Sequence, residues 1–117
     1  MKAIKRLLGL RSGPEPVLRV LMVCSGNICR SPTAEGVLRA KLDRAGLADR
    51  IAVDSAGTQG LHAKEPPDPR AQSHARARGY DLSVLRARKI VAEDFLRFHH
   101  ILDPRTGMPA RGAAAAA

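Results

Sequence analysis

The segment that decides the fold lies at residues 17–32 and reads VLRVLMVCSGNICRSP. Its first part, residues 17–23, is apolar at nearly every position and rich in β-branched side chains, which is typical of a central parallel strand covered on both faces. Pro32 fits the first position of a helix, where its missing N–H is not needed. A strand, a short loop and a helix in this order form the start of a βαβ unit.

The rest of the chain continues the same pattern. Apolar side chains recur at helical spacing over residues 34–45, and Gly46 ends this helix where a C′ glycine belongs. We further predict a short strand at residues 51–53, a helix over residues 69–79 capped by Asp68, a short helix over residues 92–98 and a strand at residues 99–102. The predicted fold is therefore a single α/β domain with a short parallel sheet flanked by helices.

Cys24 and Arg30 fall in a C-x5-R pattern across the loop and predict an oxyanion site. The loop N–H groups can converge at the N-terminus of the following helix, where the helix dipole favours negative charge. A cysteine held there has its thiolate stabilised, and the thiolate is the attacking form. Arg30 adds a planar set of donors that can bind two phosphate oxygens. In an open parallel sheet, the ligand is also expected beyond the carboxyl end of the first strand, which is where Cys24 lies.

Three further loop residues have types that suit such a site. Gly26 and Asn27 tolerate the left-handed backbone that a tight anion-binding loop requires. Ser31 can cap the helix while directing its hydroxyl at the sulfur of Cys24. We therefore expect the loop to be rigid and preorganised for an anion.

The run CSGNICRSP at residues 24–32 resembles the signature of the low-molecular-weight protein tyrosine phosphatases. The resemblance continues through DSAGT at 54–58, PDPR at 67–70, RGYDLS at 78–83, AR at 87–88 and residues 94–102. It covers residues 18–102, which we assign as an incomplete phosphatase domain, with 1–17 as a basic flexible lead-in and 103–117 as an irregular tail. The resemblance implies a flavodoxin-like or Rossmann-like phosphatase fold whose C-terminal strand and helix are missing, as in a chain truncated or altered after Leu102.

The resemblance also implies an activity, namely hydrolysis of phosphotyrosine in proteins through a phosphocysteine intermediate. Such an enzyme is a phosphoric monoester hydrolase and needs no metal or other cofactor. In this scheme Cys24 attacks phosphorus, and Arg30 stabilises the transition state together with the loop amides. The residues expected at the substrate are Ser25, Gly26, Asn27, Ile28, Cys29, Ser31 and Leu61. The implied partners are phosphotyrosine proteins, a bacterial tyrosine kinase among them, and phosphate or another oxyanion.

Three positions depart from the family pattern. Leu61 stands where the family usually has an aromatic residue, so it keeps an apolar wall for the substrate ring without stacking on it. Leu85 stands where a histidine commonly supports the loop asparagine, so we expect that supporting hydrogen bond to be absent. Asp103 is followed by Pro104 directly after the third predicted strand, whereas the family presents its general acid on a later Asp-Pro loop. Asp103 is the candidate acid, and an enzyme without an acid would be impaired.

Two other functions stay open. The first is a pseudophosphatase that binds phosphate or phosphotyrosine without turnover. The second is an arsenate reductase of the related kind, which would need further cysteines, and the sequence has none after Cys29. Cys29 itself has two interpretations: in the family the matching cysteine forms a disulfide with the nucleophile on oxidation, and the alternative is a small residue at a helix start. The four histidines, His62, His74, His99 and His100, show no spacing that completes a metal site.

Composition narrows the class of protein. The 117-residue chain carries a net charge of +9 but only one Tyr, two Phe and no Trp, so it has few rings for stacking on bases, and we predict no nucleic-acid partner. We assign the charge to solvated helix faces and to attraction for acidic or phosphorylated partners. No apolar run approaches the length of a membrane span. The two cysteines and the lack of a secretion signal predict a cytoplasmic location.

Overall fold

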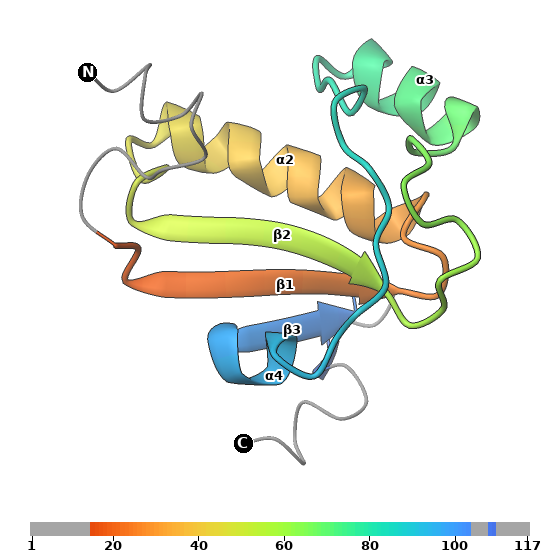
Figure 1. The fold of residues 1–117 in the computed structure, drawn as a ribbon. Helices are drawn as coiled ribbons and strands as arrows, with labels where there is room; N and C mark the ends of the chain where they lie inside the picture. The colour runs from red at the N-terminus through yellow and green to blue at the C-terminus, as the bar shows by residue number, and fades with distance from the viewer. Residues whose placement is uncertain (1–14, 104–107, 110–117) are drawn as a thin grey trace, which may run out of the picture.

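The computed structural model of the protein describes residues 15–103 and 108–109. Four strands form one sheet in the order β2-β1-β3-β4 (Figure 1). β1 (Leu18–Cys24) pairs in parallel with β2 (Ile51–Gly57) on one side and with β3 (His100–Asp103) on the other. β4 (Met108–Pro109) pairs antiparallel with β3. The prediction of an α/β fold with a parallel sheet is confirmed.

Two strands differ in extent from the prediction. β1 runs to Cys24, so the cysteine is the last strand residue and not the first loop residue. β2 continues past the predicted residues 51–53 to Gly57. The polar pair Asp54 and Ser55 hid this extension, because a strand buried on both faces is expected to be apolar. Both polar side chains fit within the sheet because Ser55 donates a hydrogen bond to Glu35 and Asp54 accepts hydrogen bonds from Arg88.

The first helix begins earlier than predicted. α2 (Arg30–Arg44) has Cys29 as its N-cap residue, and no side chain caps it. Pro32 is therefore the third helical residue, which it tolerates because the N–H groups of a first helical turn have no partner within the helix. The prediction that Ser31 caps this helix is wrong, since Ser31 lies within the first turn and directs its hydroxyl elsewhere. The helix ends as predicted, with Gly46 at a φ of 74°.

The two remaining helices lie where the sequence predicts them. α3 (Pro69–Ala77) is capped by Asp68, whose carboxylate accepts hydrogen bonds from the N–H groups of Arg70 and Ala71. α4 (Asp94–Arg97) is a single turn inside the predicted helix at residues 92–98. It leads directly into β3.

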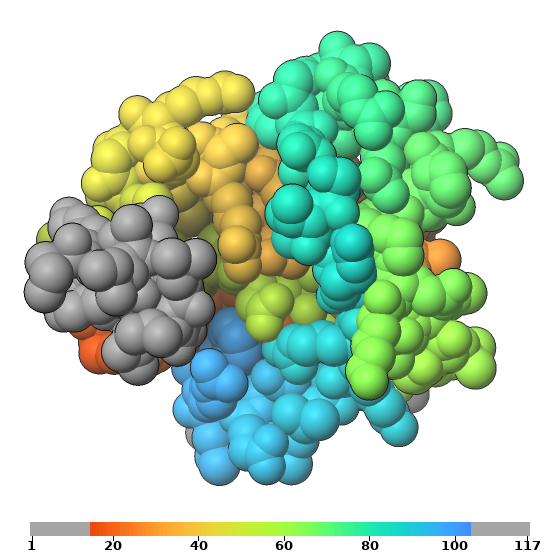
Figure 2. Space-filling view, turned by 45° about the horizontal axis from the view of Figure 1, so that its top comes forward, coloured from red at the N-terminus to blue at the C-terminus, as the bar shows by residue number. Residues whose placement is uncertain are grey.

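The sheet lies between α2 and the residues in and around α4. α2 runs along β1 and β2 on one face (Figure 1). On the other face the buried residues Leu21, Val23, Ala56 and Ile101 form a cluster, against which the partly buried Ile90, Phe95 and Phe98 pack. Figure 2 shows the segment after α3 descending across the molecule from α3 to α4. The segment thus begins beside α2, where Leu82 packs against Gly36, and its last part reaches the opposite face of the sheet with Ile90 and α4.

The C-terminal prediction needs a correction. The tail was expected to be irregular from residue 103, yet Asp103 ends β3 and Met108–Pro109 form β4. Proline is tolerated there because β4 is an edge strand, where no ladder N–H is required on the outer side. Residues 1–14 of the predicted lead-in and residues 110–117 of the tail lie outside the described residues. Among the described helices, none is long and apolar enough to span a bilayer.

Candidate functional site

The loop between β1 and α2 surrounds a pocket of about 320 Å³. The pocket lies at the carboxyl end of β1 and the N-terminus of α2, as the sequence predicts. Six of the predicted site residues line it, namely Cys24, Ser25, Gly26, Ile28, Cys29 and Arg30. Asn27 and Ser31 lie behind this lining, and both are buried. The structure therefore brings together eight of the ten predicted site residues.

The sulfur of Cys24 lies within a set of hydrogen-bonding groups. It lies 2.9 Å from the hydroxyl oxygen of Ser31, and it accepts a hydrogen bond of 3.3 Å from the backbone N–H of Asn27. Burial alone would raise the pKa of the Cys24 thiol. The Ser31 hydroxyl and the backbone amides of Ser31, Asn27 and Cys29 outweigh burial and hold that pKa below its ordinary value of 9.0. Cys24 thus has the properties of an activated nucleophile.

Asn27 holds the loop in its bent conformation. Its φ of 59° lies in the left-handed region, as predicted, and its side chain is buried. The amide oxygen accepts a hydrogen bond of 2.9 Å from the backbone N–H of Arg88. The amide nitrogen donates one of 2.9 Å to the hydroxyl of Ser31. The expectation for Leu85 concerned a single side-chain hydrogen bond, and the structure shows that Asn27 is held by the backbone N–H of Arg88 and by Ser31.

Gly26 has a different role from the predicted one. Its φ is not positive, so a left-handed conformation is not the reason for a glycine here. A Cβ built at this position would lie 3.1 Å from the Cδ2 atom of His62. The His62 ring is in turn fixed by Glu65, whose carboxylate lies 2.7 Å from Nδ1. The glycine therefore gives the loop room beside this ring.

Gly57 is a site-supporting residue that sequence reasoning did not single out. A Cβ on Gly57 would lie 2.7 Å from the carbonyl oxygen of Ser25 and 3.0 Å from the carbonyl carbon of Gly26, which is closer than real Cβ atoms come to backbone. The end of β2 also bonds the loop, since Gln59 N–H donates to Ser25 O over 2.9 Å. The signal was present in the DSAGT motif, but only the fold shows which backbone its glycine approaches.

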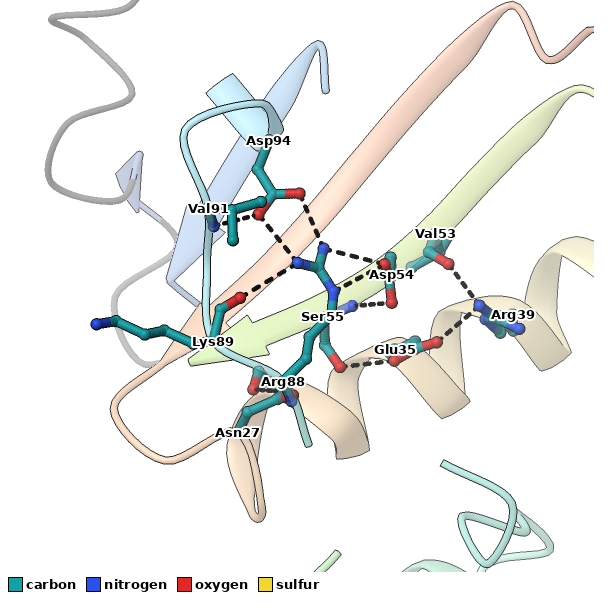
Figure 3. A network of polar contacts seen from close by, with 11 residues as sticks. Asn27, Glu35, Arg39, Val53, Asp54, Ser55, Arg88, Lys89, Val91 and Asp94 are labelled. Atoms are coloured by element: carbon teal, nitrogen blue, oxygen red, sulfur yellow. Dashed lines mark hydrogen bonds and ion pairs between the residues drawn. The ribbon is translucent and has the colours of Figure 1, made fainter. Parts of the chain in front are cut away.

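A second supporting group lies opposite α2 and centres on Arg88 (Figure 3). Its guanidinium bonds Asp54 of β2 at 3.1 and 3.3 Å and both carboxylate oxygens of Asp94 at 3.0 Å. Burial would raise the pKa of the Asp94 carboxyl, but its hydrogen bonds to Arg88 and to the Val91 N–H lower it. Asp94 is therefore ionised at neutral pH, and the side chains of both Asp54 and Asp94 pair with the Arg88 guanidinium.

Glu35 forms a separate group on the α2 side of the sheet (Figure 3). The Ser55 hydroxyl donates a hydrogen bond of 2.6 Å to this buried carboxylate, and Arg39 pairs with it at 2.8 Å. Burial raises the pKa of the Glu35 carboxyl, against the lowering effect of Ser55 and Arg39. Because Ser55 and Asp54 are neighbours in β2, their side chains point to opposite faces of the sheet.

Two predicted residues do not join the pocket. Leu61 is 77% exposed and does not line it. Asp103 lies in β3, half-buried, and is not among the lining residues either. Among the described residues, no group of three or more His, Cys, Asp or Glu side chains could hold a metal ion.

The chain is similar to known phosphatases over this region. The family model for low molecular weight phosphotyrosine protein phosphatase matches residues 19–104. The enzyme of that name from Homo sapiens is 46% identical over 71% of this chain and 52% of its own length. The one from Schizosaccharomyces pombe is 44% identical over 72% of this chain and 54% of its own length.

A solved structure gives the same result for the fold. YfkJ from Bacillus subtilis superimposes with a TM-score of 0.73 at 37% identity, over 78% of this chain and 57% of that one. The chain spans about half the length of the curated relatives it matches.

Proposed function

Because the chain belongs to the low molecular weight phosphotyrosine protein phosphatase family, we propose that it hydrolyses phosphotyrosine in proteins through a phosphocysteine intermediate. The observation that carries this proposal is the sulfur of Cys24, which accepts a hydrogen bond from the Asn27 backbone amide and lies 2.9 Å from the Ser31 hydroxyl, beside a pocket lined by Arg30. An anion-binding loop with a thiolate at its base is what phosphoryl transfer to sulfur requires.

The reaction has two displacement steps. In the first, the Cys24 thiolate attacks phosphorus, a sulfur–phosphorus bond forms, and the bond to the tyrosine oxygen breaks. Arg30 and the loop amides neutralise the charge on the phosphoryl oxygens. In the second step, water attacks phosphorus, the sulfur leaves as thiolate and inorganic phosphate is released. The Ser31 hydroxyl favours that departure because it stabilises the thiolate.

The first step also needs a proton for the leaving tyrosine oxygen. Among the described residues that line the pocket there is no carboxylate, and Asp103 at the end of β3 is the candidate that the sequence supplies. This observation favours the second candidate function, a domain that binds phosphotyrosine or phosphate with little turnover. A good leaving group separates the two functions, because it departs without protonation.

The proposed partners are phosphotyrosine proteins, with a bacterial tyrosine kinase as one candidate, and free phosphate as a competing ligand. The described pocket lining includes the basic side chain of Arg30, which suits an anionic substrate. A cytoplasmic location remains our prediction from the two cysteines, which are both free.

The experiment compares the parent protein with Cys24→Ser and Arg30→Lys. We expect Cys24→Ser to abolish hydrolysis of p-nitrophenyl phosphate while it keeps measurable vanadate binding, because the loop amides and Arg30 remain. Arg30→Lys should weaken both, since a single ammonium cannot bind two oxygens in the same geometry. Equal turnover by Cys24→Ser and the parent would refute the mechanism. Vanadate binding by a parent without turnover would favour the binding-only alternative.

A further inference from the structure

A line of contacts leads from Arg88 to the sulfur of Cys24. We propose that Arg88, held by Asp54 and Asp94, is a positioning residue that fixes the amide of Asn27 and thereby points the Ser31 hydroxyl at Cys24. This inference deepens the proposed function and rests on the role assigned there to Cys24. The residues involved come from β1, the β1–α2 loop, α2, β2, the segment between α3 and α4, and α4 itself.

Each hydrogen bond in this series has a direction that is set by a group able only to donate or only to accept. The backbone N–H of Arg88 can only donate, so the atom of Asn27 that faces it at 2.9 Å must be the amide oxygen. The amide nitrogen of Asn27 therefore faces Ser31 and donates to its hydroxyl oxygen at 2.9 Å. The hydroxyl hydrogen of Ser31 then donates to the Cys24 thiolate at 2.9 Å, because a thiolate has no hydrogen and can only accept.

The guanidinium of Arg88 keeps the Arg88 backbone N–H, which donates to Asn27, in place. A single nitrogen, Nη2, bonds Asp54 at 3.1 Å and Asp94 at 3.0 Å, so the two carboxylates lie close together. Asp94 is 1% exposed and also accepts from the Val91 N–H at 2.8 Å, so it cannot turn to solvent. Without the guanidinium these carboxylates would repel each other and separate α4 from β2. Arg88 lies between Asp54 and Asp94 in the sequence, so its backbone N–H would shift when α4 and β2 separate.

Other charged groups act on this cluster more weakly. Glu35 of α2 interacts electrostatically with both Arg88 and Asp54 from the opposite face of the sheet. Arg97 of α4 interacts with Asp94. The backbone of residue 88 has one further fixed contact, since its carbonyl accepts from the Gly57 N–H at 2.8 Å. The same short segment is thus tied to the loop through Asn27 and to the end of β2 through Gly57.

The test measures the thiol pKa of Cys24 from the pH dependence of its alkylation by iodoacetamide. Peptide mass spectrometry follows Cys24 separately from Cys29 in the full chain. Four proteins form a double-mutant cycle: the parent, Arg88→Met, Ser31→Ala and the double variant. Arg39→Met is the matched control, because Arg39 also pairs with a buried carboxylate and donates to a β2 carbonyl, and neither of these contacts involves the β1–α2 loop.

We expect Arg88→Met to raise the thiol pKa by about one unit when Ser31 is present, which is the size of effect that loss of one hydrogen bond to a thiolate gives. In the Ser31→Ala background, Arg88→Met should add little, because the line of contacts is already broken. Arg39→Met should leave the pKa unchanged. Asp94→Asn keeps the size of its side chain and should reproduce the Ser31-dependent shift in smaller measure, which keeps the test valid if Arg88→Met unfolds.

The opposite results would overturn the inference. An equal pKa rise with and without Ser31 would mean a general loss of structure, and no rise in either background would mean that Arg88 does not act on the thiol. Alkylation does not require turnover, so the two proposals can fail separately. A Ser31-dependent shift in a protein that hydrolyses no aryl phosphate would support the positioning role and refute the phosphatase reaction.

Discussion

The Ser31 hydroxyl lies 2.9 Å from the sulfur of Cys24 although Ser31 is in the first turn of α2 and Cys24 ends β1. A serine at this place in a chain commonly caps a helix, and here the helix has no side-chain cap. The Ser31 hydroxyl instead lies within hydrogen-bond distance of the Cys24 sulfur. The first turn of α2 therefore gives up capping energy of about 1 kcal/mol and gains a hydrogen bond to the nucleophile.

The lowered pKa of Cys24 predicts how its reactivity changes with pH. The thiolate is the reactive form, so alkylation by iodoacetamide should persist to lower pH in the folded protein than in the same protein unfolded in urea, where the pKa returns to its ordinary value. The free energy of unfolding changes with pH in the same direction. Because the pKa of Cys24 is lower in the folded protein than in the unfolded one, this group stabilises the fold at pH values above the ordinary thiol pKa. The contribution is lost as the pH falls through the lowered pKa. Identical pH profiles for folded and unfolded Cys24 would contradict the described site.

Gly57 and Gly60 form a matched pair for testing loop support. We expect Gly57→Ala to lower phosphate affinity and turnover by about 10²-fold, because its Cβ would push against the Ser25 and Gly26 backbone and displace the loop. Gly60→Ala should have little effect, since its Cβ would meet only the flexible Lys89 side chain at 3.5 Å or more. Phosphate titration by calorimetry and steady-state kinetics measure both variants. Similar losses in the two variants would refute the proposed support.

Asn27 affects stability through its amide hydrogen bonds and through its left-handed backbone, and two variants separate these contributions. Asn27→Ala loses both amide hydrogen bonds and also places an alanine at a φ of 59°, so its free energy of unfolding should fall by about 2–4 kcal/mol. Asn27→Gly loses the same bonds without backbone strain and should be about 1 kcal/mol more stable than Asn27→Ala. Urea unfolding measures both values. If the two variants are equally stable, the left-handed backbone is not a source of strain.

The leaving group tests the role of Asp103. If no acid protonates the leaving oxygen, p-nitrophenyl phosphate should react about 10²–10⁴-fold faster than phenyl phosphate, because only the former leaves readily as an anion. Asp103→Asn should then change neither rate. Comparable rates on both substrates, together with a large loss in Asp103→Asn, would identify Asp103 as the acid.

Local sequence signals were sufficient for the loop and for its main elements. The C-x5-R pattern after an apolar strand predicted the position of Cys24 and Arg30, and Asp68 and Gly46 predicted helix ends correctly, because each of these signals acts within a few residues. The full extent of β2 was not predicted, because the polar side chains of Asp54 and Ser55 form hydrogen bonds with residues that are distant in the sequence. Those partners, Arg88 and Glu35, cannot be identified from periodicity.

The supporting residues were the hardest part of the site to predict. Leu85 predicted that one side-chain hydrogen bond to Asn27 is absent, but it could not show which other groups bind the amide. The hydrogen bond comes from the backbone of Arg88, which any residue type could supply. Gly57 depends in the same way on which backbone lies beside it. Leu61 was placed at the substrate by resemblance alone, and its described position does not line the pocket.

The most direct test of the account is to trap the covalent intermediate. The protein is mixed with p-nitrophenyl phosphate, quenched in acid during turnover and digested, and the peptides containing Cys24 and Cys29 are analysed by mass spectrometry. Phosphate on the sulfur of Cys24, none on Cys29 and none in the Cys24→Ser protein is the result that the account predicts. Turnover without a phosphorylated Cys24, or phosphate on another residue, would contradict it.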